Sequence, residues 1–256
     1  MVTSIKPAAF YYATNLDRVS LPALTHIASH AFEGTGIATL DLPWENIVSI
    51  GQNAFYLATN GLPYNLTLTK LTAISAGAFG GTNAAKNTQL RTVSLPIWTG
   101  SAPTETGLTV GGAPGAFGYC SALTGVYAPE LLSIPASTFQ YCTALTELSF
   151  PKATSIGSGA FSGCSNLTKL DIGGAVSSLS SGFLVNTSKF DAFILRGVTS
   201  VPTLGASTFN NTRIASGTAY IYVPQSLESL FKVASRWSNY AAQIRAIEDY
   251  PDVCGS

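Results

Sequence analysis

Charged residues are scarce in this chain of 256 amino acids. Asp, Glu, Lys and Arg together make up 10% of the sequence, and 13 basic residues balance 13 acidic ones. A neutral surface sets up no broad electric field that would attract phosphate backbones or anionic lipids. The composition therefore argues against nucleic-acid binding and against attachment to a membrane surface.

Long apolar runs are also missing, although hydrophobic residues make up 46% of the chain. No run approaches the roughly 18 consecutive apolar residues that a membrane-spanning helix requires. The first residues, Met1 to Pro7, contain no basic region followed by an apolar stretch, so the sequence shows no secretion signal. We expect a soluble chain with no membrane insertion.

Motifs for catalysis or cofactor binding are absent too. The two histidines, His26 and His30, flank Ile27 in a segment that we expect to be extended or turning, so they do not share a helical face. They are confined to one early repeat, and no cysteine pair has the CxxC spacing of a zinc site. We therefore predict no catalytic residue, no metal site and no cofactor.

Repetition is what the chain has in place of such motifs. Leu123, Leu145 and Leu167 recur at intervals of 22 residues, a period typical of one stacked supersecondary unit. Each unit contains a short alternating segment and then an apolar residue followed, five positions later, by phenylalanine. The pattern predicts one continuous solenoid whose core anchors are Phe32, Phe55, Phe79, Phe117, Phe139, Phe161, Phe183 or Leu184, and Phe209.

The alternating segments predict nine strands stacked in parallel as one wall of the solenoid. The segment from each apolar residue to its phenylalanine should form the opposite wall, with short strands, helical turns and stacked rings in the core. Prolines just after strands should end the ladder and turn the chain. The nine predicted strands are 19–21, 40–42, 66–68, 93–95, 126–128, 148–150, 170–172, 193–195 and 221–223.

Insertions interrupt the repeat at 56–63, 80–88 and 98–114, and insertions in a solenoid emerge as surface loops. The longest begins with Trp98. This side chain has two interpretations: contact with a ligand, or cover for the edge of a neighbouring coil, where large aromatic side chains are usually buried.

The cysteines follow the same period. Cys120, Cys142 and Cys164 recur every 22 residues, which predicts a column of buried free thiols. Cys254 lies in the C-terminal tail, where we expect it to be exposed.

The motifs Leu-x-x-Leu-x-Leu-Pro, Ile-x-x-x-Ala-Phe and Gly-x-Cys-x-x-Leu occur together, most clearly between Leu123 and Cys164. In this combination the sequence resembles the BspA-like leucine-rich repeats of bacterial surface proteins. The resemblance covers nearly the whole chain and is weaker in unit three, where Thr69 replaces the proline, and in units seven and eight.

The resemblance implies a leucine-rich-repeat solenoid, a β-dominated α/β right-handed superhelix. A parallel sheet would form one face, short strands and helical turns the other, and a helical cap the C-terminal end. Family members with assigned roles are mostly adhesins or binders of host proteins, and similar tails occur in phage-derived proteins of gut bacteria. The resemblance thus implies a binding scaffold, extracellular or at the cell surface.

We expect residues 1–223 to form about nine units, the first truncated, and residues 224–256 to form a helical cap and tail. Ser226 is placed to cap a helix whose apolar stripe continues through Trp237. That stripe comprises Leu227, Leu230, Phe231, Ala234, Trp237, Tyr240 and Ile244.

The opposite end of the chain lacks a comparable cap. Ser4 to Phe10 copies the pattern of Ser155 to Phe161, so the chain begins midway through a repeat. Our hypothesis is that it is the C-terminal piece of a longer protein.

Alternation assigns the outward side chains of the sheet, the best place to expect binding. Tyr127, Tyr220 and Tyr222 stand out, because tyrosine is enriched at binding surfaces, although strand propensity explains tyrosine there as well. Of the acids, Glu147 and Asp171 on adjacent strands could pair for glycosidic cleavage, but a cross-strand charge ladder with Lys169 explains them. The candidate binding residues are Trp98, Tyr127, Glu147, Lys169, Asp171, Tyr220 and Tyr222.

The sequence as a whole favours a non-enzymatic scaffold that binds a protein partner, outside a bacterial cell, through its sheet face and insertion loops. The alternative is a phage or surface-fibre module that acts as a spacer or a carbohydrate-contacting tip, with a surface glycan as partner.

Overall fold

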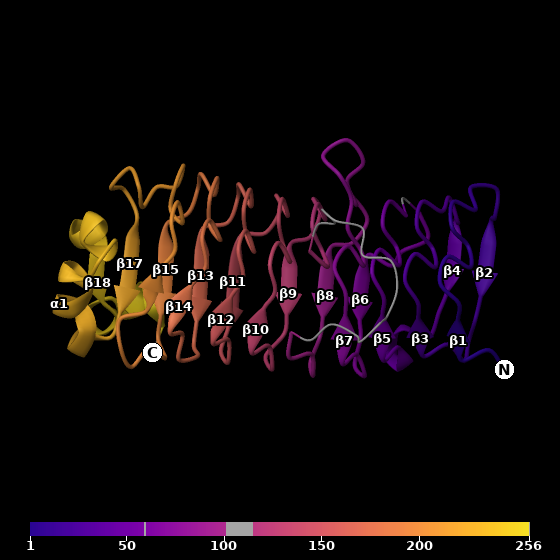
Figure 1. Cartoon of the computed structure of the whole chain (residues 1–256), viewed down its shortest axis with the longest axis horizontal. Helices are drawn as coiled ribbons and strands as arrows, with labels where there is room; N and C mark the ends of the chain where they lie inside the picture. The colour runs from indigo at the N-terminus through magenta and orange to yellow at the C-terminus, as the bar shows by residue number, and fades with distance from the viewer. Residues whose placement is uncertain (59, 101–114, 256) are drawn as a thin grey trace.

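The computed structural model describes residues 1–58, 60–100 and 115–255, whose coils stack side by side along one long axis (Figure 1). Each regular coil contributes a strand of three or four residues to one wall, the sheet wall, and a strand of two residues to the opposite, short-strand wall. Every strand pair is parallel. The predicted parallel-sheet solenoid is confirmed.

The sheet wall contains all nine predicted strands, each beginning one residue earlier than the alternation suggested. Their hydrogen bonds form three ladders in place of the one continuous sheet that we expected: β2–β4, β6–β8–β9 and β11–β13–β15–β17. Between β4 and β6, Gly61 of an insertion bridges Thr39 and occupies the pairing edge of β4. The strands are β2 (Arg18–Ser20), β4 (Thr39–Asp41), β6 (Asn65–Thr67), β8 (Thr92–Ser94), β9 (Gly125–Tyr127), β11 (Glu147–Phe150), β13 (Lys169–Ile172), β15 (Ala192–Leu195) and β17 (Tyr220–Val223).

The short-strand wall consists of two four-stranded ladders, β1–β3–β5–β7 and β10–β12–β14–β16. In each strand the second residue, an isoleucine or leucine, packs toward the core, and the first residue lies on the outer side. A 3-10 turn, η1 (Trp44–Asn46), lies between the walls. The strands are β1 (Ser4–Ile5), β3 (His26–Ile27), β5 (Ser49–Ile50), β7 (Ala73–Ile74), β10 (Ser133–Ile134), β12 (Ser155–Ile156), β14 (Ser178–Leu179) and β16 (Thr203–Leu204).

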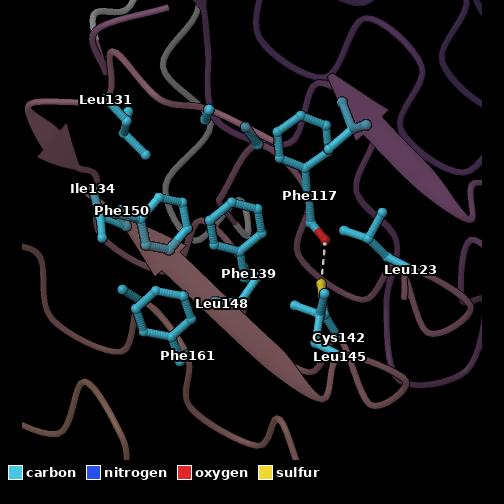
Figure 2. Close-up of a cluster of buried hydrophobic side chains, with 14 of the residues drawn as sticks. Phe117, Leu123, Leu131, Ile134, Phe139, Cys142, Leu145, Leu148, Phe150 and Phe161 are labelled. Carbon is cyan, nitrogen blue, oxygen red and sulfur yellow. Dashed lines mark hydrogen bonds between the residues drawn. The ribbon is translucent and has the colours of Figure 1, made fainter. Parts of the chain in front are cut away.

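Stacked phenylalanine rings run along the core between the walls. Ring centroids of successive coils lie 5.1 to 5.7 Å apart and nearly parallel from Phe10 to Phe161. In the next coil Leu184 takes the stacking position. The Phe183 carbonyl accepts a hydrogen bond from the Phe161 N–H, just as the Ala160 carbonyl accepts one from the Phe139 N–H, so Phe183 is equivalent to Ala160 and Leu184 to Phe161. Figure 2 shows part of this core around Phe139. The predicted ring stack is confirmed as far as Phe161.

The C-terminal end is covered by α1 (Gln225–Val233) and by the 3-10 segment η2 (Trp237–Gln243). Phe231 and Trp237 are buried, and the Trp237 indole N–H donates to the Pro202 carbonyl (2.7 Å). A tenth strand, β18 (Ile244–Ala246), then pairs with β17, and η3 (Ile247–Asp249) and α2 (Pro251–Cys254) complete the tail.

Three expectations for this end were wrong. Pro224 occupies the N-cap position of α1 with no side-chain cap bond, so Ser226 is not the cap. Leu230 is 52% exposed, and Ile244 lies in β18 in place of a continued helical stripe. The helix ends at Val233 because Ala234 adopts an extended backbone (φ −70°, ψ 149°) that an α-helix cannot include.

Candidate binding surface

The outer face of the sheet wall is open over its first coils and carries small polar side chains. Ser20 donates a hydrogen bond to Asp41 on the next coil (2.8 Å), and Thr92 donates to Asn65 (2.7 Å). These cross-coil bonds follow from the parallel register, which aligns equivalent residues of successive strands. The face therefore carries short polar side chains that form hydrogen bonds with one another across the coils.

Tyr127 is the aromatic residue that stands out on this face. It lies at the end of β9, in register with Ser94 of β8, and 60% of its surface is exposed. A large ring on a face of small side chains offers apolar area together with a hydroxyl group. The structure thus places Tyr127 where the alternation predicted it.

Tyr220 and Tyr222, the other two tyrosines of the candidate set, are not equally accessible. Tyr220 is 37% exposed, and the Arg245 guanidinium lies 4.6 Å from its ring centroid, a cation–π contact. Tyr222 is 4% exposed, so the expectation that it lies on an open surface was wrong. Its ring packs against Tyr250, with centroids 5.5 Å apart.

The cover over Tyr222 is the C-terminal tail. Residues 247–254 fold back over β15 and β17, where Cys254 is buried with Ala192, Ile194 and Tyr222 in a small second core. Cys254 is therefore not the exposed thiol that we expected, because its side chain fills the apolar space above the sheet. Burial raises the pKa of this thiol.

The same tail rearranges the predicted charge ladder. Glu147 and Lys169 are in register on β11 and β13, but the Lys169 ammonium donates to the Val253 carbonyl (2.7 Å). Asp171 accepts from Arg196, whose Nε lies 2.9 and 3.0 Å from the two carboxylate oxygens. The prediction of a charge ladder through Glu147, Lys169 and Asp171 was therefore wrong. Glu147 itself is exposed.

Trp98 is fully buried in the core, so of its two interpretations the structure supports cover for the coils over ligand contact. The rest of its insertion, residues 101–114, lies outside the described residues. Any contribution of that loop to binding remains a prediction.

The cysteine column is a structural feature of the core. Cys120, Cys142 and Cys164 are fully buried free thiols, as expected. Each donates to a phenylalanine carbonyl of the preceding coil, at 3.3, 3.1 and 3.0 Å, and Figure 2 draws the Cys142 bond to Phe117. Burial raises the pKa of Cys164 to about 12 and raises those of Cys120 and Cys142 as well.

Among the described residues, no three His, Cys, Asp or Glu side chains gather closely enough to hold a metal ion. Within the same part of the chain, no helix is both long and apolar enough to cross a membrane.

Sequence reasoning missed two features of the surface. The first is the tail over β15 and β17. The second is a group of tyrosines outside the sheet, including Tyr11 and Tyr12, which are about half exposed. The doubled tyrosine after Phe10, and Tyr56 after Phe55, were signals that the repeat pattern had left unused.

Comparisons with known proteins agree with this fold. The sequence matches the family described as BspA type leucine-rich repeat region, in 6 copies, over residues 1–96 and 113–235. No curated protein matches the chain.

Several solved structures resemble the chain. The pneumococcal vaccine antigen PcpA is 15% identical with a TM-score of 0.51, over 96% of this chain and 64% of PcpA. A leucine-rich cell surface protein from Faecalibacterium prausnitzii A2-165 is 20% identical with a TM-score of 0.43, over 93% of this chain and 62% of that protein. A leucine-rich repeat protein from Bacteroides ovatus ATCC 8483 is 15% identical with a TM-score of 0.33, over 96% of this chain and 81% of that protein. The chain thus spans less than two thirds of the first two proteins, and at these identities the likeness concerns the fold alone.

Proposed function

The chain belongs to the BspA-type leucine-rich-repeat family, and we propose that it is a non-enzymatic scaffold that holds a protein partner against the outer face of its sheet wall. We further propose that it does so at the surface of a bacterial cell, as the resemblance to bacterial surface proteins implies.

The observation that carries this proposal is that Tyr127 is 60% exposed on a face whose other side chains are mostly small and polar. Tyrosine is among the side chains that most often dominate protein–protein binding energy, especially where small residues around it can exclude water. Glu147, which is also exposed, lies on the next strand of this wall and would give the partner a charged group to recognise.

The tail limits where such a partner can lie. Because residues 247–254 cover β15 and β17, the accessible part of the face extends from β2 to β11. The low charge of this face favours a partner recognised by shape and hydrogen bonds over one attracted by a strong field.

A crosslinking experiment tests this proposal. A photoreactive phenylalanine analogue is placed at position 127, or at Val233 on α1 as the control, and each protein is incubated with extracellular host proteins. The Val233 site is a matched control because this residue is 78% exposed but lies on the cap. We expect a partner that crosslinks from position 127 alone.

The affinity of the purified partner then provides the quantitative measurement. Tyr127→Ala should weaken binding roughly 30-fold, the effect of a central interface residue, whereas Val233→Ala should leave it unchanged. Equal affinities of the two variants would refute the proposed site.

A further inference from the structure

Five tyrosines gather on one long edge of the solenoid, away from the sheet face. Each follows a core phenylalanine by one or two residues, in the turn that leads a coil from the short-strand wall to the sheet wall. The loop between β7 and β8 projects from the solenoid beyond its neighbours (Figure 1). We call these residues the apical tyrosine row: Tyr11, Tyr12, Tyr56, Tyr119 and Tyr141.

The first half of the row is well exposed and has a defined geometry. Tyr11 and Tyr12 are 52% and 49% exposed, and their ring centroids lie 4.7 Å apart in an edge-to-face arrangement. The Tyr12 ring lies against the backbone of the next coil at Gly34, where an added Cβ would come within 2.7 Å of the ring. Glycine at that position, in a left-handed conformation (φ 62°), lets the ring lie close to the backbone.

The second half repeats this construction. Tyr119 and Tyr141 stack with ring centroids 4.8 Å apart, and Tyr141 lies against Gly163 of the following coil. From the first coil to the sixth, five steps of about 4.8 Å give the row a length on the order of 24 Å.

Tyr56 connects the two halves. Burial raises the pKa of its hydroxyl, and the charges of Glu33, Tyr12 and Tyr119 raise it further. Backbone hydrogen bonds continue this edge on both sides of Tyr56: the Gly34 N–H donates to the Tyr56 carbonyl (2.8 Å), and the Leu57 N–H donates to the Gly80 carbonyl (3.1 Å).

The row carries little net charge. Its acidic group, Glu33, is 7% exposed and lies 2.5 Å from the His30 ring nitrogen Nδ1, so the carboxylate is paired within the protein. Tyr11 and Tyr12 are about half exposed and the other three tyrosines are partly exposed, so the row presents uncharged aromatic side chains to solvent. Aromatic faces pack against the C–H groups of sugar rings, and phenolic hydroxyls exchange hydrogen bonds with sugar hydroxyls.

We propose that the apical tyrosine row binds a neutral glycan chain that lies along the edge and crosses the coils. A glycan fits better than a charged polymer, because the row offers no uncompensated cluster of charge for phosphate, sulfate or carboxylate groups. It fits the row better than a compact protein because the five tyrosines form a narrow line along an edge. This site is separate from the sheet face around Tyr127, so either proposal can fail without the other.

Electrophoresis in gels that contain soluble polysaccharides tests the glycan site. The probes are the neutral polymers laminarin, galactomannan, xyloglucan and yeast mannan, with pectin and heparin as acidic ones. We expect at least one neutral polymer to retard the wild-type protein and the acidic ones to have no effect. Failure of every neutral polymer to retard it, or retardation by the acidic polymers alone, would overturn the proposal.

Variants then locate the site with an oligosaccharide of the retarding polymer, by titration calorimetry. Tyr11→Ala and Tyr56→Ala should each weaken binding up to about tenfold, the loss of one aromatic contact. The exposed tyrosine of the sheet face provides the matched control: Tyr127→Ala should not change glycan affinity.

Tyr56→Phe keeps the ring and is the control for a folding defect in Tyr56→Ala. Thermal unfolding of both variants will detect such a defect. Tyr56→Phe should retain most of the affinity, because it loses a hydroxyl and not an aromatic face. If Tyr127→Ala weakens glycan binding as much as Tyr11→Ala and Tyr56→Ala do, the glycan site is not the apical row.

Discussion

The column of buried thiols predicts that the protein loses stability at alkaline pH. Cys120, Cys142 and Cys164 are fully buried and donate to carbonyl oxygens, so the folded state keeps them protonated. Their pKa values are raised in the folded protein, that of Cys164 to about 12, above the ordinary value of 9.0. Their contribution to stability is therefore complete below about pH 9 and is lost as the pH rises from there towards the folded-state values.

The magnitude follows from the unfolded state, in which the thiols ionise at their ordinary pKa of 9.0. At about pH 10, ionisation lowers the free energy of the unfolded chain by roughly 1.4 kcal/mol for each thiol, and near pH 8 by less than about 0.1 kcal/mol. The three thiols of the column together should remove roughly 4 kcal/mol of unfolding free energy between these two values. That is a large fraction of the stability of an ordinary domain.

Urea unfolding under reducing conditions measures this loss, with the fluorescence of the buried Trp98 and Trp237 as the signal. Cys142→Ala removes one thiol, so the loss between pH 8 and pH 10 should shrink by about 1.4 kcal/mol, whatever the variant costs at neutral pH. A variant with all three cysteines replaced by alanine reports the background from tyrosine ionisation. Equal pH-dependent losses in this variant and the wild type would refute the reasoning.

Three further predictions concern packing. Phe139→Ala should destabilise the protein by about 3 to 5 kcal/mol, because the ring lies inside the stack. Phe10→Ala, at the partly exposed end of the stack, should cost less than about 2 kcal/mol. Equal losses of unfolding free energy for these two variants in urea would contradict a continuous core. Gly163→Ala should cost at least about 1 to 2 kcal/mol, since the backbone is left-handed (φ 74°) and the new Cβ would meet the Tyr141 ring, and a melting temperature equal to the wild type's would count against this. Deletion of residues 247–256 should expose the apolar side chains on β15 and β17. It should lower the unfolding free energy by roughly 3 kcal/mol and increase the binding of a hydrophobic dye. Unchanged dye binding would show that the tail does not cover these strands.

The tail also marks the limit of what local sequence patterns predict. Alternation placed Tyr222 on the outer face of β17, and the backbone does point it there, yet the side chain is buried. The bond from Lys169 to Val253 joins residues 84 positions apart, a separation that no repeat period contains. A strand pattern specifies which face a side chain occupies, but not what a distant segment does to that face.

The sequence by itself determined the stacked coils, the nine strands of the sheet wall, the phenylalanine stack and the buried thiols of Cys120, Cys142 and Cys164. These features repeat with a fixed period, and each coil packs mainly on its immediate neighbours, so local patterns carry the information. Only the tertiary structure decided that Trp98 is buried, that the tail covers β15 and β17, and that the apical tyrosines meet along one edge. The accessibility of a side chain depends on every segment that packs near it, and the irregular segments of this chain follow no period.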